Sequence, residues 1–131
     1  RRPLRSPLAA HELLLRGLPR KALTHLIDNL VVLRPTIPLQ KAIGMSLRTL
    51  QRHKGEATQP LSQDQSGRIW KFAEVLAKAT MVLGSQEEAE RWLERPAMAL
   101  DRRRPLDLLA TPAGTGIVEE FLGRLEYGVY A

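Results

Sequence analysis

The sequence predicts an all-α protein in which an N-terminal helix-turn-helix lobe is followed by a small helical domain. Every periodic segment places its apolar residues three or four positions apart, which is the spacing of a helix with one buried face. No stretch alternates apolar and polar residues over the length of a strand, and residues 31–33 form the only short β-like cluster. Hydroxyl residues at helix starts, and glycines or prolines at helix ends, divide the chain into separate helices.

The first part of the chain opens with a basic tail, residues 1–7, that two prolines interrupt. Three helices are expected after it, from Leu8 to Leu15, from Arg20 to Leu33 and from Ile37 to Ile43. Gly17-Leu18-Pro19 separates the first two because glycine and proline both disfavour a continuing helix. Pro35 ends the second helix, and Thr36 is an expected N-cap of the third.

Residues 37–54, IPLQKAIGMSLRTLQRHK, read as two short helices joined at Gly44, with Ser46 as the cap of the second. This arrangement is typical of a helix-turn-helix. Four apolar residues stand where the two helices must pack on each other: Leu39, Ile43, Met45 and Leu50. Gln40 occupies a position where such motifs favour a small residue, a departure that predicts a wider crossing of the helices.

The second of these helices carries polar and basic residues on its predicted outer face. The candidate DNA-binding residues are Ser46, Arg48, Thr49, Gln51, Arg52 and Lys54. Arginine and glutamine reach base edges in the major groove with two hydrogen bonds, and a helix start suits a phosphate. The simpler alternative is an ordinary basic surface helix, since motif matches of this kind are often false.

The second half of the chain contains clear capping signals. Ser62 to Gln65 and Ser85 to Glu88 have the form of capping boxes, in which the serine hydroxyl and the side chain three residues later each accept a hydrogen bond from the other residue's backbone N–H. The first opens the longest helix, which Gly84 ends. Its expected buried stripe is Ile69, Phe72, Ala73, Leu76, Thr80 and Leu83, and Trp70, Ala77 and Met81 widen the apolar surface.

Three further helices are expected after Gly84. The first ends at Arg95 and buries Ala89, Trp92 and Leu93, the second is a turn from Pro105 to Leu109, and the third follows Thr111-Pro112 and buries Val118, Phe121, Leu122 and Leu125. Gly128 closes the last helix. Arg102 to Arg104 are interpreted as a solvated loop, and contact with a partner protein or a DNA phosphate is the minority interpretation.

Charge is unevenly distributed along the 131 residues. Residues 1–60 hold eleven lysines and arginines against three acidic residues, whereas the remainder holds nine against eleven. A basic front half and a slightly acidic back half suggest surfaces for two different partners, and the front half suits a polyanion. With 44% apolar residues, the chain can form one globular unit or two small helical lobes.

Several classes of function are disfavoured. Cysteine is absent, which removes disulfides, thiolate catalysis and most structural zinc sites, and indicates a reducing cytoplasm. The three histidines, His11, His25 and His53, have no metal-like spacing, and Gly114-Thr115-Gly116 is too little for a phosphate loop. No run is long enough to span a membrane, and the start lacks an apolar signal core. We therefore expect no enzyme, no cofactor, no metal and no membrane partner.

The last third of the chain carries its most specific pattern. The fixed positions are Trp92-Leu93, Pro96, Leu100, Pro105 to Leu109, Thr111, Gly114, Leu122, Arg124 and Tyr127-Gly128. In this order and spacing, they resemble the toxin-binding domain of the Xre/MbcA/ParS antitoxins over roughly residues 62 to 131. The resemblance implies an Xre-like helix-turn-helix upstream, so we divide the chain into a DNA-binding and dimerisation region, 1–60, and a toxin-binding domain, 61–131.

The resemblance also implies a function: neutralisation of a RES-domain toxin, an enzyme that degrades NAD, and repression of the chain's own operon by a homodimer bound to operator DNA. The alternative is a helix-turn-helix transcription regulator whose C-terminal domain only oligomerises. A weaker alternative, an NAD-processing enzyme, predicts activity of the isolated chain.

The C-terminal end is the predicted toxin-binding element. Its candidate residues are Glu120, Arg124, Tyr127, Gly128, Val129, Tyr130 and Ala131. Tyrosine offers a large rigid contact with a polar tip, so Tyr127, Tyr130 and the carboxylate of Ala131 are expected to block the cleft in which the toxin binds anionic NAD. The alternative, favoured for each tyrosine taken singly, is that it folds back onto this chain's own core.

Overall fold

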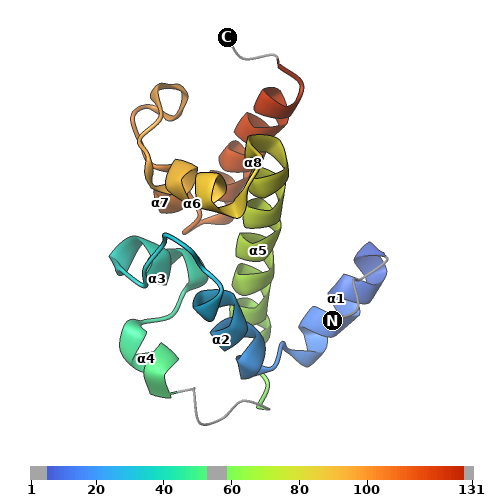
Figure 1. Ribbon diagram of the computed structural model, residues 1–131. Coiled ribbons are helices and arrows are strands. Elements are labelled where there is room, and N and C mark those ends of the chain that lie inside the picture. Colours follow the sequence, from blue (N-terminus) through green and yellow to red (C-terminus); the bar gives the residue numbers. More distant parts are fainter. Residues whose placement is uncertain (1–5, 53–58, 129–131) are drawn as a thin grey trace.

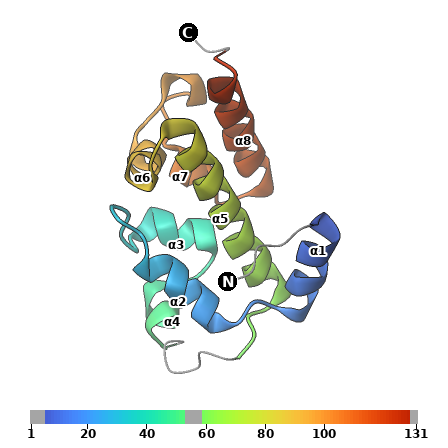
Figure 2. The ribbon, with the colours of Figure 1, turned by 45° about the vertical axis from the view of Figure 1, so that its right-hand side comes forward.

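Helix α5, Gln63–Leu83, is the longest element and runs through the middle of the molecule (Figures 1 and 2). The structure is a computed structural model that describes residues 6–52 and 59–128. Before α5 come α1 (Pro7–Arg16), α2 (Arg20–Asp28), α3 (Ile37–Ile43) and α4 (Leu47–Arg52). After it come α6 (Gln86–Glu94), the 3₁₀ turn η2 (Met98–Leu100), α7 (Pro105–Leu108) and α8 (Pro112–Glu126).

The described residues form no strand. Their only β-type pairings are two isolated bridges, between Pro19 and Pro60 and between Ala97 and Arg103. The predicted all-α class is therefore confirmed.

Helix α5 begins and ends at the predicted residues. The Ser62 hydroxyl accepts a hydrogen bond from the Gln65 N–H at 3.1 Å, and Gly84 ends the helix in the left-handed region with φ 102°. Gly84 adopts this conformation readily because it has no Cβ.

The buried stripe of α5 differs in part from the predicted one. Ile69, Phe72 and Leu76 are buried as predicted, but Val75 and Ala79 are buried too, while Ala73, Thr80 and Leu83 are only half-buried. Ala77 and Met81, predicted to widen the apolar surface, are exposed, and Trp70 is half-buried. The buried arc is set by the elements that contact α5, which include α3, α6 and α8, and the periodicity alone does not reveal their positions.

Helix α2 is shorter than predicted. It ends at Asp28 instead of continuing to Leu33, and the Asn29 side chain caps it by donating a hydrogen bond to the His25 carbonyl at 2.7 Å. The N–H groups of residues 31–33 bond to the carboxylate of Glu90 on α6 instead of to carbonyls one helical turn earlier. A tertiary contact therefore overrides the local tendency to continue the helix.

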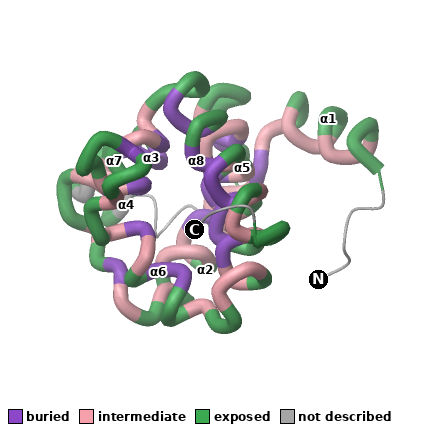
Figure 3. Tube along the Cα trace, turned by 90° about the horizontal axis from the view of Figure 1, so that it is seen from above, coloured by how far each residue is buried: buried purple, intermediate pink, exposed green. Residues whose placement is uncertain are grey.

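Helix α1 lies to one side of the body and has no buried residue, as Figures 2 and 3 show. Its inner face, with Leu13 and Leu14, is partly covered, while Leu8 and Leu15 are exposed. The Gln63 side chain links the end of α1 to the start of α5 by donating to the Leu15 carbonyl at 3.3 Å.

The C-terminal helices follow the predicted pattern closely. Helix α6 ends at Glu94, one residue before the predicted end, and α7 ends at Leu108, also one residue early. The Thr111 hydroxyl caps α8 by accepting from the Gly114 N–H at 3.0 Å, with Pro112 as the first helical residue. Most residues predicted to be buried here are buried: Ala89, Leu93, Val118, Phe121 and Leu122. In and beside α7, Pro105, Leu106 and Leu109 are buried as well. Trp92 and Leu125 are half-buried, and the ring centroids of Trp92 and Phe121 lie 5.6 Å apart.

One hydrophobic core joins the two halves of the chain. It runs without a break from Leu33, Leu39 and Ile43 through Phe72 to Leu122. Helix α3 also packs on α7, and the Lys71 ammonium on α5 contacts the Glu119 carboxylate on α8 at 3.3 Å. The predicted division of the chain at residue 60 stays a prediction.

Candidate functional sites

The turn between α3 and α4 requires a glycine. Gly44 has φ 72°, and a Cβ at this position would lie 2.6 Å from Cδ of Arg68. Arg68 approaches the turn from α5, where its guanidinium donates to the Lys41 carbonyl at 3.4 Å. Leu39, Ile43 and Met45 are buried as predicted, whereas the side chain of Leu50 lies outside those that the structure describes. Helix α3 and the turn after it thus pack on α5, as the core of a helix-turn-helix would.

Gln40 fits beside the turn without pointing into the core. Its side-chain amide donates to the carbonyl of Pro35, just before the start of α3, at 2.8 Å, and the small residue Ala42 is buried two positions later. The wider helix crossing that Gln40 predicts stays a prediction.

The outer face of α4 carries the candidate DNA-binding residues. Arg48, Gln51 and Arg52 are exposed at i, i+3 and i+4, so they lie together on one side of the helix. Ser46 is exposed and caps the helix, because its hydroxyl accepts from the Thr49 N–H at 3.2 Å and lies 2.9 Å from the Thr49 hydroxyl. Thr49 is half-buried, and Lys54 and His53 lie outside the described residues.

The exposed face of α8 carries the described part of the candidate toxin-binding set. Glu120, Arg124 and Tyr127 follow at intervals of four and three residues and are all exposed, with Ile117 three residues before Glu120. The Glu120 carboxylate pairs with the Arg124 guanidinium at 3.7 Å, and Gly128 has φ 65°. Val129, Tyr130 and Ala131 lie outside the described residues.

Tyr127 does not fold back onto the core. Its side chain is 79% exposed at the end of α8, so the alternative favoured from sequence for this residue is wrong. Helix α8 buries Val118, Phe121 and Leu122 on its opposite face, which leaves Tyr127 on the outer side of the helix. A large aromatic ring in this position is available to a partner.

The two candidate faces lie far apart on the molecule. In Figures 1 and 2, α4 lies at one end of α5, and the C-terminal end of α8 lies beside the other. The two candidate faces therefore do not overlap.

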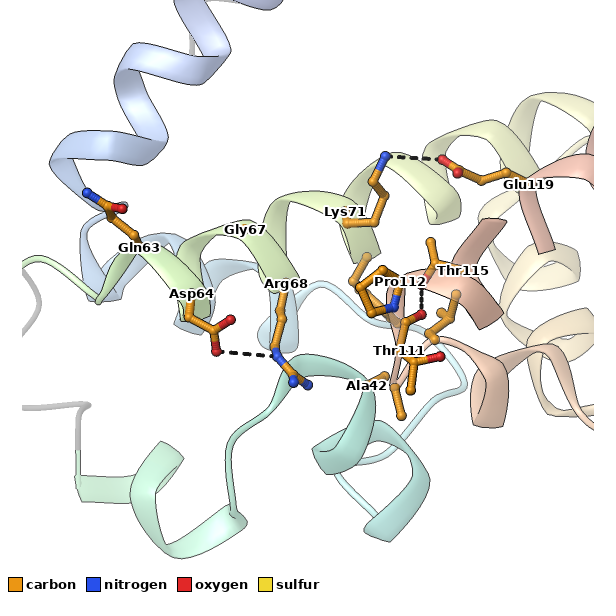
Figure 4. A pocket seen from close by; sticks show the side chains of 13 residues that line it. Ala42, Gln63, Asp64, Gly67, Arg68, Lys71, Thr111, Pro112, Thr115 and Glu119 are labelled. Atoms are coloured by element: carbon orange, nitrogen blue, oxygen red, sulfur yellow. Dashed lines mark hydrogen bonds and ion pairs between the residues drawn. The ribbon is translucent and has the colours of Figure 1, made fainter. Parts of the chain in front are cut away.

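A groove of about 510 Å³ lies between α3, α5 and the start of α8 (Figure 4). Its charged side chains are paired across or beside it, Arg68 with Asp64 at 3.5 Å and Lys71 with Glu119 at 3.3 Å. The Thr115 hydroxyl donates to the Thr111 carbonyl at 2.9 Å. Because these groups bond to one another, we assign the groove no ligand.

The loop of Arg102 to Arg104 is exposed as predicted at its first two residues but not at the third. Arg102 and Arg103 are exposed, but Arg104 is half-buried and donates two hydrogen bonds to the Asp107 carboxylate, at 2.9 and 3.1 Å. This pairing raises the pKa of the Arg104 guanidinium above its ordinary value. It fixes the start of α7.

Two buried residues have roles that the sequence reading missed. Gly114 belongs to the triplet that is too short for a phosphate loop, but a Cβ there would collide with the Leu108 carbonyl, so glycine permits α7 and α8 to approach closely. Glu90 is fully buried and bonds to the loop between α2 and α3. The sequence could have indicated this burial, because Glu90 stands three residues before Leu93 and therefore on the same, buried face of α6.

Two other kinds of feature are absent from the part of the chain that the structure describes. No group of histidine and acidic side chains is arranged to hold a metal ion. None of the helices there has the length and apolar character needed to cross a membrane.

Comparison with known proteins matches both halves of the chain to families. Residues 9–74 match the antitoxin Xre-like helix-turn-helix domain, and residues 78–128 match the antitoxin Xre/MbcA/ParS C-terminal toxin-binding domain. Together the two matches span α1 to α8. The exposed face of α4 lies in the first match, and the exposed face of α8 lies in the second.

Three curated relatives agree with these matches. The chain is 35% identical over 91 residues to the antitoxin Xre of Pseudomonas putida KT2440, and the matched residues make up 70% of this chain and 57% of that protein. It is 33% identical over 101 residues to the antitoxin Xre of Yersinia enterocolitica, covering 74% and 66%. It is 28% identical over 98 residues to the Prs ADP-ribosylating antitoxin of a Sphingobium strain, covering 67% and 62%. The chain therefore spans somewhat less than two thirds of the length of these relatives.

Proposed function

This chain belongs to the Xre/MbcA/ParS antitoxin family, and from that premise we propose that it neutralises a RES-domain, NAD-degrading toxin and represses its own operon. The toxin-binding role is carried by one observation above the others. An aromatic side chain that is 79% exposed, Tyr127, stands at the end of α8 within the toxin-binding family match.

Neutralisation is proposed to work by covering the toxin's active site. Helix α8 is anchored by its buried face and presents Glu120, Arg124 and Tyr127 on the other, so the partner meets a rigid surface and little entropy is lost on binding. Gly128 redirects the chain after the helix, and residues 129–131 are proposed to extend into the NAD-binding cleft.

The DNA-binding role is proposed for the exposed face of α4. Arg48, Gln51 and Arg52 are placed to reach base edges, while Ser46, Thr49 and the N–H groups at the start of α4 contact phosphate. Lys54 completes the predicted set. The eleven basic residues of the first sixty attract the duplex before specific contacts form.

Operator binding is proposed to require a homodimer. Two-fold symmetric helix-turn-helix proteins place two reading helices about 34–36 Å apart, one turn of duplex, so the operator should contain two half-sites at that spacing. Light scattering of the free protein, together with footprinting on the promoter of its operon, measures the dimer and the half-site spacing.

The decisive experiment measures NAD loss by the protein encoded beside this chain. We expect that protein alone to consume NAD, and the purified complex with this chain to leave NAD intact. If the two proteins do not co-purify and NAD loss is unaffected, the neutralisation proposal is wrong, and a transcription regulator whose C-terminal domain only oligomerises is the better description. NAD consumption by this chain alone would identify it as an enzyme instead.

A further inference from the structure

Helix α6 carries a glutamate on its buried face. Glu90 is 0% exposed and lies beside Ala89 and Leu93, which are buried in the core. An ionised carboxylate removed from water is costly unless hydrogen bonds replace the lost hydration. Such a residue in the core therefore needs a specific set of donors.

The donors come mainly from three successive backbone N–H groups. One carboxylate oxygen, Oε1, accepts from Val31 at 2.9 Å, from Val32 at 2.6 Å and from Leu33 at 2.8 Å. The other, Oε2, accepts from Val31 at 2.9 Å and from the Gln86 side-chain amide at 2.7 Å. Burial alone would raise the pKa of Glu90, but these hydrogen bonds together lower it below its ordinary value. The group is therefore charged at neutral pH.

These hydrogen bonds connect the two family domains. Glu90 and Gln86 lie in the segment that matches the toxin-binding domain, whereas Val31 to Leu33 lie in the segment that matches the helix-turn-helix domain. Gln86 also donates to the Asn29 carbonyl at 2.8 Å, directly after α2. Helix α6 thus holds the loop at its beginning and through Leu33. Three residues later, Thr36 occupies the N-cap position of α3, although its side chain makes no capping hydrogen bond.

The helix pair that follows this loop has little stability of its own. Helices α3 and α4 contain seven and six residues, and isolated helices of that length do not form in water. The direction of α4 is therefore set by what surrounds it: the buried side chains of α3, the contact of Arg68 with the turn, and the path of the incoming loop.

We propose that Glu90 is a positioning residue for DNA binding, which fixes the loop before α3 and thereby orients the α3–α4 pair relative to the toxin-binding domain. Its effect on DNA rests on the proposed function, but its effect on the loop does not. It follows that the toxin-binding half of the chain contributes a residue to DNA binding without touching DNA.

The test compares Glu90→Gln with Glu88→Gln, which removes the same charge from an exposed position on the same helix. The glutamine amide is nearly isosteric but replaces one acceptor oxygen with a donor, so it cannot accept all the hydrogen bonds that Glu90 receives. Gln86→Ala is a second, milder variant that removes one of those hydrogen bonds and the contact with Asn29.

Hydrogen exchange of the full-length protein provides a readout that needs no ligand. In Glu90→Gln we expect faster exchange of the amides of residues 31–43, with α8 and the second half of α5 unchanged. Gln86→Ala should show a smaller change in the same region, and Glu88→Gln none. Unchanged exchange in residues 31–43, or an equal increase throughout the protein, would overturn the proposal. If Glu90→Gln does not fold, the Gln86→Ala profile decides by the same criterion.

The second readout is binding to a duplex that carries the promoter of the protein's own operon. For Glu90→Gln we expect a loss of roughly 2- to 30-fold in affinity for this duplex, with toxin binding unchanged. Equal affinity of Glu90→Gln and wild type for the duplex would overturn the role in DNA binding. Failure of the wild type to bind the duplex would instead contradict the proposed function, and the exchange experiment would still test the positioning of the loop.

Discussion

At the residue scale, two glycines of α8 show how the same residue type serves different ends. Gly114 is buried against the Leu108 carbonyl, whereas a Cβ on Gly123 would have no atom within 4 Å. We expect Gly114→Ala to lower the free energy of unfolding by roughly 1–3 kcal/mol, because α7 and α8 must separate. Gly123→Ala should raise it by about 0.5–1 kcal/mol by removing a flexible residue from a helix. Urea denaturation of the two variants measures their free energies of unfolding. A similar decrease in both would contradict the explanation.

The ionisation of Glu90 gives a pH dependence of known sign. Because the pKa of Glu90 is lowered in the folded state, its contribution to stability is fully present above the ordinary pKa of glutamate, about 4.3. The contribution is lost as the pH falls from that value through the lower pKa of the folded protein. Urea denaturation between pH 7 and pH 3 should therefore show a stability difference between wild type and Glu90→Gln that is largest near neutrality and shrinks in acid. A difference that stays constant over this range would show that hydrogen-bond geometry, and not charge, is responsible.

At the scale of the element, the exposed face of α4 is tested by removing its two described arginines. The double variant Arg48→Ala, Arg52→Ala should lose roughly 2–6 kcal/mol of specific binding if both side chains contact bases. Arg102→Ala, Arg103→Ala is the matched control, since it removes the same charge from an exposed loop in the other half. Gel shifts at moderate salt measure both, and an unchanged affinity of the α4 variant would remove the helix from the interface.

The end of α8 is tested with Tyr127→Ala. A central aromatic anchor of a protein interface contributes about 2 kcal/mol or more, so toxin affinity should fall by roughly 30-fold or more. Ile37→Ala removes an exposed apolar side chain from the start of α3 and should leave toxin binding unchanged. Calorimetric titration of the toxin with each variant separates the two, and equal affinities would assign Tyr127 no role at the interface.

At the scale of the whole molecule, the two faces lie at opposite ends of α5, so their functions should separate (Figure 1). Deleting residues 129–131 should restore NAD breakdown by the toxin while the affinity for operator DNA is retained. NAD breakdown by the toxin and the affinity for operator DNA are both measured for the truncated protein and for the full-length protein as the reference. A truncated protein that still neutralises the toxin completely would refute the role proposed for this segment.

The amino-acid pattern alone determined the all-helical class, most helix boundaries and the family resemblance. Capping residues such as Ser62, Ser85 and Thr111 act through hydrogen bonds to the next turn, so their effect is local and readable from the order of residues. The exposed face of α4 was predictable for the same reason, because a helix places residues three and four apart on one side.

The tertiary structure decided what depends on contacts between distant segments. Helix α2 ends at Asp28 because Glu90, about sixty residues later, takes the N–H groups of Val31 to Leu33. Gly114 is required by a neighbouring helix, and Tyr127 is exposed because α8 turns its other face to the core. Local periodicity shows that a helix has an apolar face but not which segments cover it, since that depends on packing across the whole chain.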